Sequence, residues 1–168
     1  MALNEPLLME WDMEMAGTRK SLERAPWDKA GWKPHPRSWS LGQLATHVAR
    51  LPGWAKETLE QESLDLSAAN YAELEKIAES SGALVALFER NAAAGRAAIA
   101  AADDAAFMKP WSLKRGDTVY FTLPRLAVLR SFVFNHGVHH RAQLGVYLRM
   151  LDVPVPGLYG PSADEGRV

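Results

Sequence analysis

The sequence predicts an all-α protein built as a four-helix bundle, and two observations carry this prediction. Four long stretches repeat apolar residues every three or four positions, which is the spacing of one face of a helix. No stretch shows the sustained alternation of apolar and polar residues that is typical of a sheet. A chain of 168 residues with four such helices favours a single bundle domain over residues 1–168.

The first helix is expected to begin at Asn4 as its N-cap residue, with Pro6 in the first turn, and to continue to about Leu22. The following segment, 24–39, holds three prolines and a glycine, so it predicts an irregular connection. His35 lies between two of these prolines, and we interpret it as an exposed loop histidine.

The second helix begins at a capping box formed by Ser40 and Gln43. His47 falls on its inward apolar stripe, and Pro52 should kink the helix because it lacks an N–H group and its ring meets the preceding turn. Residues 61–80 are polar and weakly periodic, with a short helix expected over 71–79. This long crossover would allow the second and third helices to run parallel.

The third helix is expected over 81–102, where many small residues would let a neighbouring helix approach closely. Residues 107–122 form either a small hairpin with Gly116 at its turn or a loop packed by aromatic side chains. The last helix should start at Pro124 and end near Leu151, and the proline-containing tail should lie over the bundle in extended or turn conformation.

The composition excludes several classes of function. The net charge is −1, with 19 Lys and Arg against 20 Asp and Glu, so the chain lacks the basic excess of a nucleic-acid binder. The absence of cysteine excludes disulfides, thiolate nucleophiles and Cys-ligated metals, which leaves imidazole, carboxylate and water as ligands. No signal peptide and no membrane-spanning run is apparent, so we expect a cytoplasmic protein without a membrane partner.

Three of the five histidines lie in the last helix, in the run 135–143. His136 and His140 are four residues apart, which places them about 40° apart on one helix face. His139 is about 60° from His136 on the other side, so the spacing alone allows either pair to bind a metal. With His47 from the second helix, three imidazoles could hold one side of a metal ion and leave its other positions to water or substrate.

Such an ion could lower the pKa of a water molecule to about 7 or polarise a carbonyl group. Asn135, Arg141 and Gln143 are close enough along the helix to support the ligands. Other sites are unsupported: no Glu-x-x-His pair, no His-Glu-x-x-His motif and no Gly-x-Ser-x-Gly elbow occurs in the sequence.

Two paired motifs carry a resemblance to a known family. The run NHGVHHRAQL at 135–144, continued at 147–149, 154–156 and 159–162, resembles the C-terminal signature of the DinB/YfiT-like superfamily. The run SWSLGQLATH at 38–47 is similar to the second-helix motif of the same superfamily. Ala142 stands where the family usually has glycine.

The resemblance implies an up-down-down-up four-helix bundle that is usually a homodimer and binds one divalent metal ion. By motif match, the ligands are His47, His136 and His140, and His139 lies off the metal. Zinc or nickel is the expected metal, and iron and manganese share the same ligands. Asn135, Arg141, Gln143 and Tyr159 are the residues expected beside the site.

The function implied by the resemblance is that of a metal-dependent hydrolase, or of a transferase that joins a small-molecule substrate to a low-molecular-weight thiol such as mycothiol or bacillithiol. The family name refers to induction by DNA damage, which suggests a stress response. The alternative hypothesis is a non-catalytic, metal-stabilised dimer that binds a small ligand or a stress-response partner.

Overall fold

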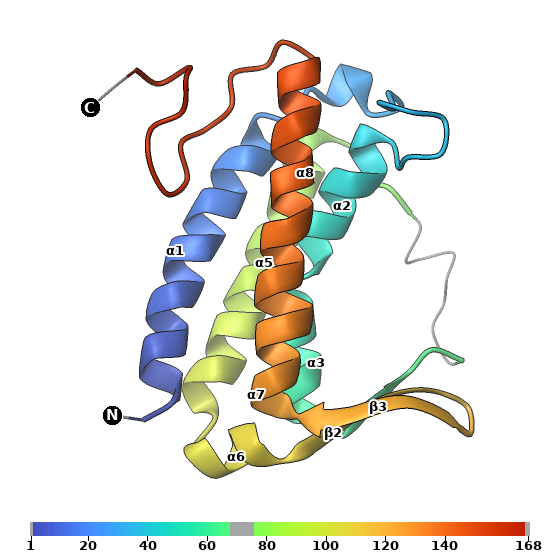
Figure 1. The fold of residues 1–168 in the computed structure, drawn as a ribbon, viewed down its shortest axis with the longest axis vertical. Coiled ribbons are helices and arrows are strands. Elements are labelled where there is room, and N and C mark those ends of the chain that lie inside the picture. The colour runs from blue at the N-terminus through green and yellow to red at the C-terminus, as the bar shows by residue number, and fades with distance from the viewer. Residues whose placement is uncertain (1, 68–75, 167–168) are drawn as a thin grey trace.

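The computed structural model describes residues 2–67 and 76–166, and it is mainly helical (Figure 1). The long helical segments are α1 (Asn4–Glu23), α2 (Leu41–Arg50), α3 (Gly53–Glu60), α5 (Ser81–Ala101) and α8 (His136–Met150). Helix α8 continues directly from α7 (Arg125–Val128) and the π-helical segment η2 (Leu129–Asn135). The shorter elements are the 3-10 helix η1 (Trp27–Lys29), helix α6 (Asp104–Met108), and strands β1 (Ser63–Asp65), β2 (Pro110–Arg115) and β3 (Thr118–Pro124).

The helices lie side by side, with α1 and α7–α8 running in one direction and α2–α3 and α5 in the other (Figure 1). Two contacts show that α1 and α5 pack antiparallel. At the start of α1 the Asn4 side chain donates to the Ala100 carbonyl near the end of α5, and near the end of α1 Arg19 pairs with Glu89 in the first half of α5. Helices α2–α3 and α5 run parallel, as the long segment between them allows.

The buried hydrophobic side chains form two clusters along these helices, and small residues permit the helices to approach closely. Trp11 is fully buried, packs edge-on against Phe134 at 5.5 Å, and donates its indole N–H to the Ala92 carbonyl at 3.3 Å. A Cβ added at Gly95 would lie 2.6 Å from the Trp11 ring, so only glycine fits there. The prediction of close packing along the third helix is therefore confirmed.

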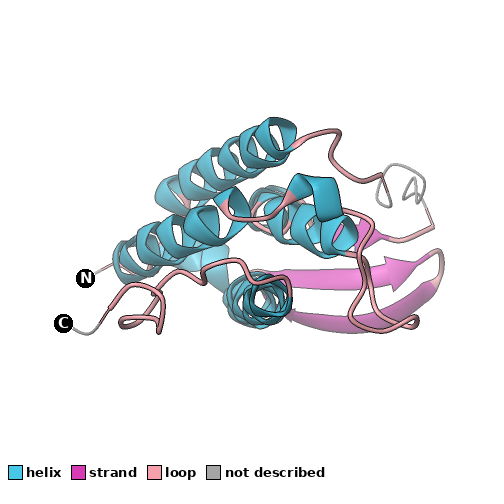
Figure 2. Cartoon of the chain, turned by 90° about the horizontal axis from the view of Figure 1, so that it is seen from above, coloured by secondary structure: helices cyan, strands magenta, loops and turns pink. Residues whose placement is uncertain are grey.

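A three-stranded sheet lies beside the helices and corrects the all-α prediction (Figure 2). Strand β2 pairs antiparallel with β3 around a turn in which Gly116 has φ +57°, so the hairpin alternative for 107–122 is the correct one. Strand β1, which was not predicted, adds to the other edge of β2 in parallel. A three-residue strand is too short to show alternation, and it exists only because β2 offers an edge.

The local signals in the second helix act as expected. Ser40 Oγ accepts the Gln43 N–H at 3.2 Å, and the Gln43 side chain accepts the Ser40 N–H at 2.9 Å, which completes the capping box. The helix breaks between α2 and α3 at Pro52, and α3 begins at the next residue.

The start of α1 differs from the prediction. Asn4 is not the N-cap of α1, because Leu3 occupies that position and its N–H donates to the Asp104 carboxylate at 2.7 Å. The Asn4 side chain instead donates to the Ala100 carbonyl at 3.2 Å, so a tertiary contact has displaced local capping. The short helix expected over 71–79 lies largely outside the described residues.

Candidate metal centre

Helices α2 and α8 bring three histidine side chains together, His47 from α2 and His136 and His140 from α8. His47 Nε2 lies 3.4 Å from His136 Nε2, and His140 Nε2 lies 2.9 Å from the same atom. One nitrogen from each ring lies within 4.8 Å of those of the other two. All three side chains are partly buried, so the cluster is neither sealed inside the core nor fully exposed to solvent.

The segment before His136 is π-helical, and it changes which residues face inward. A single 3.6-residue period would align Leu129, Val133, His136 and His140 on one stripe. The wider turns of Leu129–Asn135 instead bury Val133 and Phe134 together and leave His136 half-buried at the edge of the core. Such segments occur often at functional sites, because they rotate one part of a helix against the next.

Hydrogen bonds on the far sides of two rings determine which nitrogens carry protons. His136 Nδ1 lies 3.3 Å from the Phe132 carbonyl, which can only accept, so Nδ1 must be the protonated nitrogen. His140 Nδ1 donates in the same way to Gln143 Oε1 at 2.7 Å. Both Nε2 atoms therefore present lone pairs, and they face one another at 2.9 Å. Two lone pairs at this distance repel each other, whereas a cation placed between them would be attracted to both nitrogens.

The separations also fit the dimensions of a metal site. Two nitrogens that are each about 2.05 Å from a zinc ion lie about 2.9 Å apart at a right angle and about 3.3 Å apart at the tetrahedral angle. The observed separations of 2.9 and 3.4 Å match these two values. Imidazole suits zinc, nickel and iron alike, so the ligands fit a divalent metal without selecting one.

Burial keeps the three imidazoles neutral, which is the form that binds metal. Burial and the neighbouring histidines lower the pKa of His47 to about 4, with a further contribution from the Arg50 charge. Burial is also the main cause that lowers the pKa of His136 and of His140 below its usual value. The site therefore needs to release few protons when it binds a cation near neutral pH.

In the metal-free protein, the free energy of unfolding should fall as the pH decreases from about 6.5 to about 4. In this range the unfolded chain binds a proton at His47 that the folded chain excludes, so acid favours the unfolded state. His47→Gln should flatten this part of the curve. Denaturant titrations at a series of pH values, with a chelator present, measure the effect. An unchanged slope in His47→Gln would contradict it.

Two tryptophans that sequence reasoning did not place at the site flank the cluster. Trp39 stacks on His140 with ring centres 5.5 Å apart and planes 23° apart. The Trp39 and His47 rings pack edge to face, with their centres 5.0 Å apart. Trp54 meets His136 at 5.6 Å and His47 at 6.1 Å. Trp54 follows His47 by seven residues, or about two helical turns, and this spacing could have indicated it.

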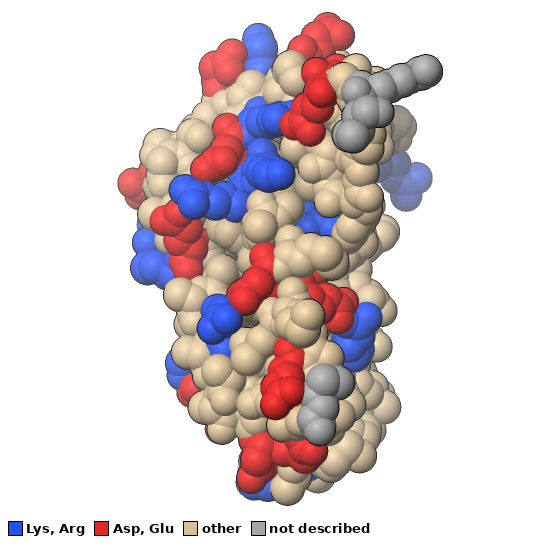
Figure 3. Space-filling view, turned by 90° about the vertical axis from the view of Figure 1, so that its left-hand side faces the viewer, with Lys and Arg blue, Asp and Glu red and all other residues tan. Residues whose placement is uncertain are grey.

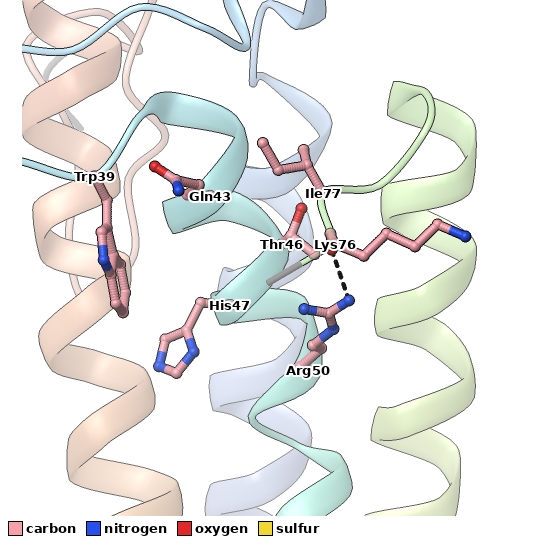
Figure 4. Close-up of a pocket in the computed structure, with 7 residues that line it drawn as sticks. All are labelled: Trp39, Gln43, Thr46, His47, Arg50, Lys76 and Ile77. Carbon is pink, nitrogen blue, oxygen red and sulfur yellow. Dashed lines mark hydrogen bonds between the residues drawn. The ribbon is translucent and has the colours of Figure 1, made fainter. Parts of the chain in front are cut away.

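A cavity of about 240 Å³ adjoins the cluster on the α2 side (Figure 4). Among the residues that line this cavity, Trp39 and His47 lie at one side and Arg50 and Lys76 at the other (Figure 4). Arg50 donates to the Lys76 carbonyl at 2.7 Å, which ties the end of α2 to the segment before α5. The residues that line the cavity are Trp39, Gln43, Thr46, His47, Arg50, Lys76 and Ile77.

The other predicted residues fall in different places. Gln143 supports the cluster through its bond to His140, whereas Asn135 is exposed. His139 is exposed and meets the side of the His140 ring at 4.8 Å, outside the group of converging nitrogens. His35 is exposed in its loop, where its Nδ1 accepts the Arg37 N–H at 3.2 Å.

Arg141 and Tyr159 bond to Glu14 on α1, in a second cluster in which the Arg141 and Glu14 side chains are buried and Tyr159 is exposed. Arg141 is only 2% exposed; it donates to the Glu14 carboxylate at 2.6 Å, to the Glu14 carbonyl at 2.9 Å and to Thr18 Oγ1 at 3.2 Å. The Tyr159 hydroxyl donates to the same carboxylate at 2.9 Å. This cluster anchors the C-terminal tail.

Comparison with known proteins identifies the family. A model of the DinB family matches residues 2–167. The chain belongs to the DinB family. The resemblance seen in the two sequence motifs is thus confirmed over nearly the whole chain.

Two solved structures support the fold of this DinB-family chain. A DinB-like protein from Bacillus cereus has a TM-score of 0.72 at 20% identity, covering 94% of this chain and 98% of its own. A DinB-like protein from Bacillus subtilis has a TM-score of 0.68 at 16% identity, covering 89% and 96%. A search of curated proteins finds no match. Among the described residues, no helix combines the length and the apolar character needed to cross a membrane.

Proposed function

We propose that this DinB-family protein is a metalloenzyme that holds one divalent ion through His47, His136 and His140, within an up-down-down-up four-helix bundle. The observation that carries the proposal is the pair of Nε2 lone pairs of His136 and His140, which face each other at 2.9 Å while both Nδ1 atoms are engaged elsewhere. Zinc and nickel are the proposed metals, with iron and manganese as alternatives.

The proposed reaction is hydrolysis, or transfer to a low-molecular-weight thiol, because three protein ligands leave positions at which a bound ion can activate water or a thiol. The chain has no cysteine, so in the second case the thiol enters as a substrate. The polar cavity beside His47 offers room for a small molecule. Trp39 and Trp54 would cover part of the His140 and His136 rings and limit the access of water to them.

We further propose that the protein acts in the cytoplasm as a homodimer. Support for self-association comes from large apolar side chains that are more than half exposed, Met9 and Met13 on α1 and Val146 and Met150 on α8. Surfaces of this kind often mark contacts between protein chains. Light scattering coupled to size-exclusion chromatography measures the mass in solution directly.

The proposal is tested by removing the metal. Protein purified without a histidine tag should contain about one ion per chain, because the three imidazoles together hold a single ion. Gentle chelation should abolish turnover of a thiol with an electrophile, or of an ester panel, and added metal should restore it. Circular dichroism should show that the helices persist throughout. Loss of thermal stability on chelation, with no turnover beforehand, would favour the non-catalytic metal-stabilised dimer.

A further inference from the structure

The described residues include two buried arginines, and they differ in how their charge is compensated. Arg141 pairs with the Glu14 carboxylate and has further acceptors. Arg125 is 7% exposed and forms no ion pair with any described residue; its side chain donates to the Gln61 carbonyl at 2.8 Å, and its Nε has no acceptor among the described residues. A buried guanidinium without a counter-charge is costly, because water is removed and nothing replaces it.

The position of Arg125 is held by the fold itself. It is the first residue of α7, directly after β3, and its backbone N–H donates to the Lys109 carbonyl at 2.9 Å. Its side chain donates to the carbonyl of Gln61, the residue directly after α3. The backbone of Arg125 is therefore fixed by Lys109 and its guanidinium by Gln61, at the end of the helices where the sheet attaches (Figure 1).

Arg125 lines a cavity of about 370 Å³ whose other groups are mostly hydrogen-bond donors. Lys109 supplies a second cation at the rim. The hydroxyls of Ser112 and Thr122 lie 2.7 Å apart on paired strands, so one donates to the other and one proton remains available. Glu62 is the single carboxylate among the lining residues, and it is exposed.

We infer that this cavity is a binding site for a small oxyanion, either free phosphate or the phosphate group of a small metabolite. Arg125 makes the buried charge-assisted hydrogen bonds to the anion, Lys109 neutralises it at the rim, and the Ser112–Thr122 pair donates the last hydrogen bond. The anion supplies the counter-charge that the described protein groups do not give Arg125. The site is independent of the histidine cluster.

Inorganic phosphate is the probe for the test, added to the full-length protein at constant ionic strength. Phosphate should raise the melting temperature in a saturable way, and calorimetry should give a dissociation constant. Arg125→Gln should weaken binding about 10- to 100-fold, the loss expected for one or two charge-assisted hydrogen bonds. A phosphomonoester titrated in parallel distinguishes free phosphate from a metabolite as the preferred ligand.

Substitutions of two exposed lysines form a matched pair of variants that test the inference even if Arg125→Gln does not fold. Lys109→Gln should weaken phosphate binding several-fold. Lys33→Gln changes the net charge equally and should leave binding unchanged, because Lys33 is an exposed residue of the segment between η1 and α2, which lies at the other end of the helices (Figure 1). The inference is overturned if phosphate gives no saturable effect. It is equally overturned if Lys109→Gln and Lys33→Gln bind phosphate as tightly as the wild type, since binding would then be an adventitious ion only.

Discussion

Replacing His136 with alanine should abolish stoichiometric metal binding, whereas replacing His139 should leave it intact. His136 is central to the cluster, because its Nε2 lies within 3.4 Å of the Nε2 of both His47 and His140. Its loss leaves two imidazoles on separate helices. Loss of a group that only orients a ligand weakens metal binding about 10- to 100-fold, so loss of a ligand itself should cost more.

His139→Ala is the matched control, because it removes an imidazole from the same run of α8 at an exposed position. Both variants should be purified without a histidine tag, checked by circular dichroism, and analysed for metal by mass spectrometry. Metal retained at about one ion per chain in a folded His136→Ala variant would refute the ligand assignment made from geometry.

Replacing Arg141 with methionine should destabilise the protein by about 3–5 kcal/mol, the usual cost of breaking a buried ion pair from one side. The carboxylate of Glu14 would stay buried without its cation, since the Glu14 side chain is 8% exposed. The Tyr159 hydroxyl and Thr18 Oγ1 would each lose a contact as well. Denaturant unfolding at neutral pH measures the change.

Arg149→Met provides the control, because Arg149 pairs with Asp164 at the surface with its side chain 52% exposed, and its loss should destabilise the protein much less than the loss of Arg141. Figure 3 shows that charges of both signs are spread over the face that carries α1 and the tail. The double change Glu14→Gln with Arg141→Met should recover part of the lost stability. Equal losses in the two single variants would show that the buried pair contributes no more than an exposed one.

Several elements could be read from the sequence because their causes are local. The capping box of Ser40 and Gln43 and the break at Pro52 depend on atoms within a few residues. The third helix was expected over 81–102 and spans Ser81–Ala101, since apolar periodicity and small residues extend through it. The placement of His136 and His140 on one face follows in the same way from helix geometry.

Other features depend on partners far away in the chain, and the sequence could not reveal them. Arg141 adjoins His140 but lies about 100° around the helix, so it faces α1 and not α2. Its partner, Glu14, is 127 residues distant. Strand β1 is held by β2, and the side chain of Asn4 serves a contact with α5 in place of capping.

By itself, the sequence determined the helices, the family motifs and the three histidines, because spacing and capping act over one or two turns. Only the tertiary structure decided how those histidines meet. The π-helical turn at Leu129–Asn135 and the antiparallel packing of α8 on α2 direct the three Nε2 atoms toward one another. Packing also places Trp39 and Trp54 beside the histidines and leaves Arg125 buried without a counter-charge among the described residues. Burial and pairing depend on every element that surrounds a residue, and the sequence alone does not show which elements those are.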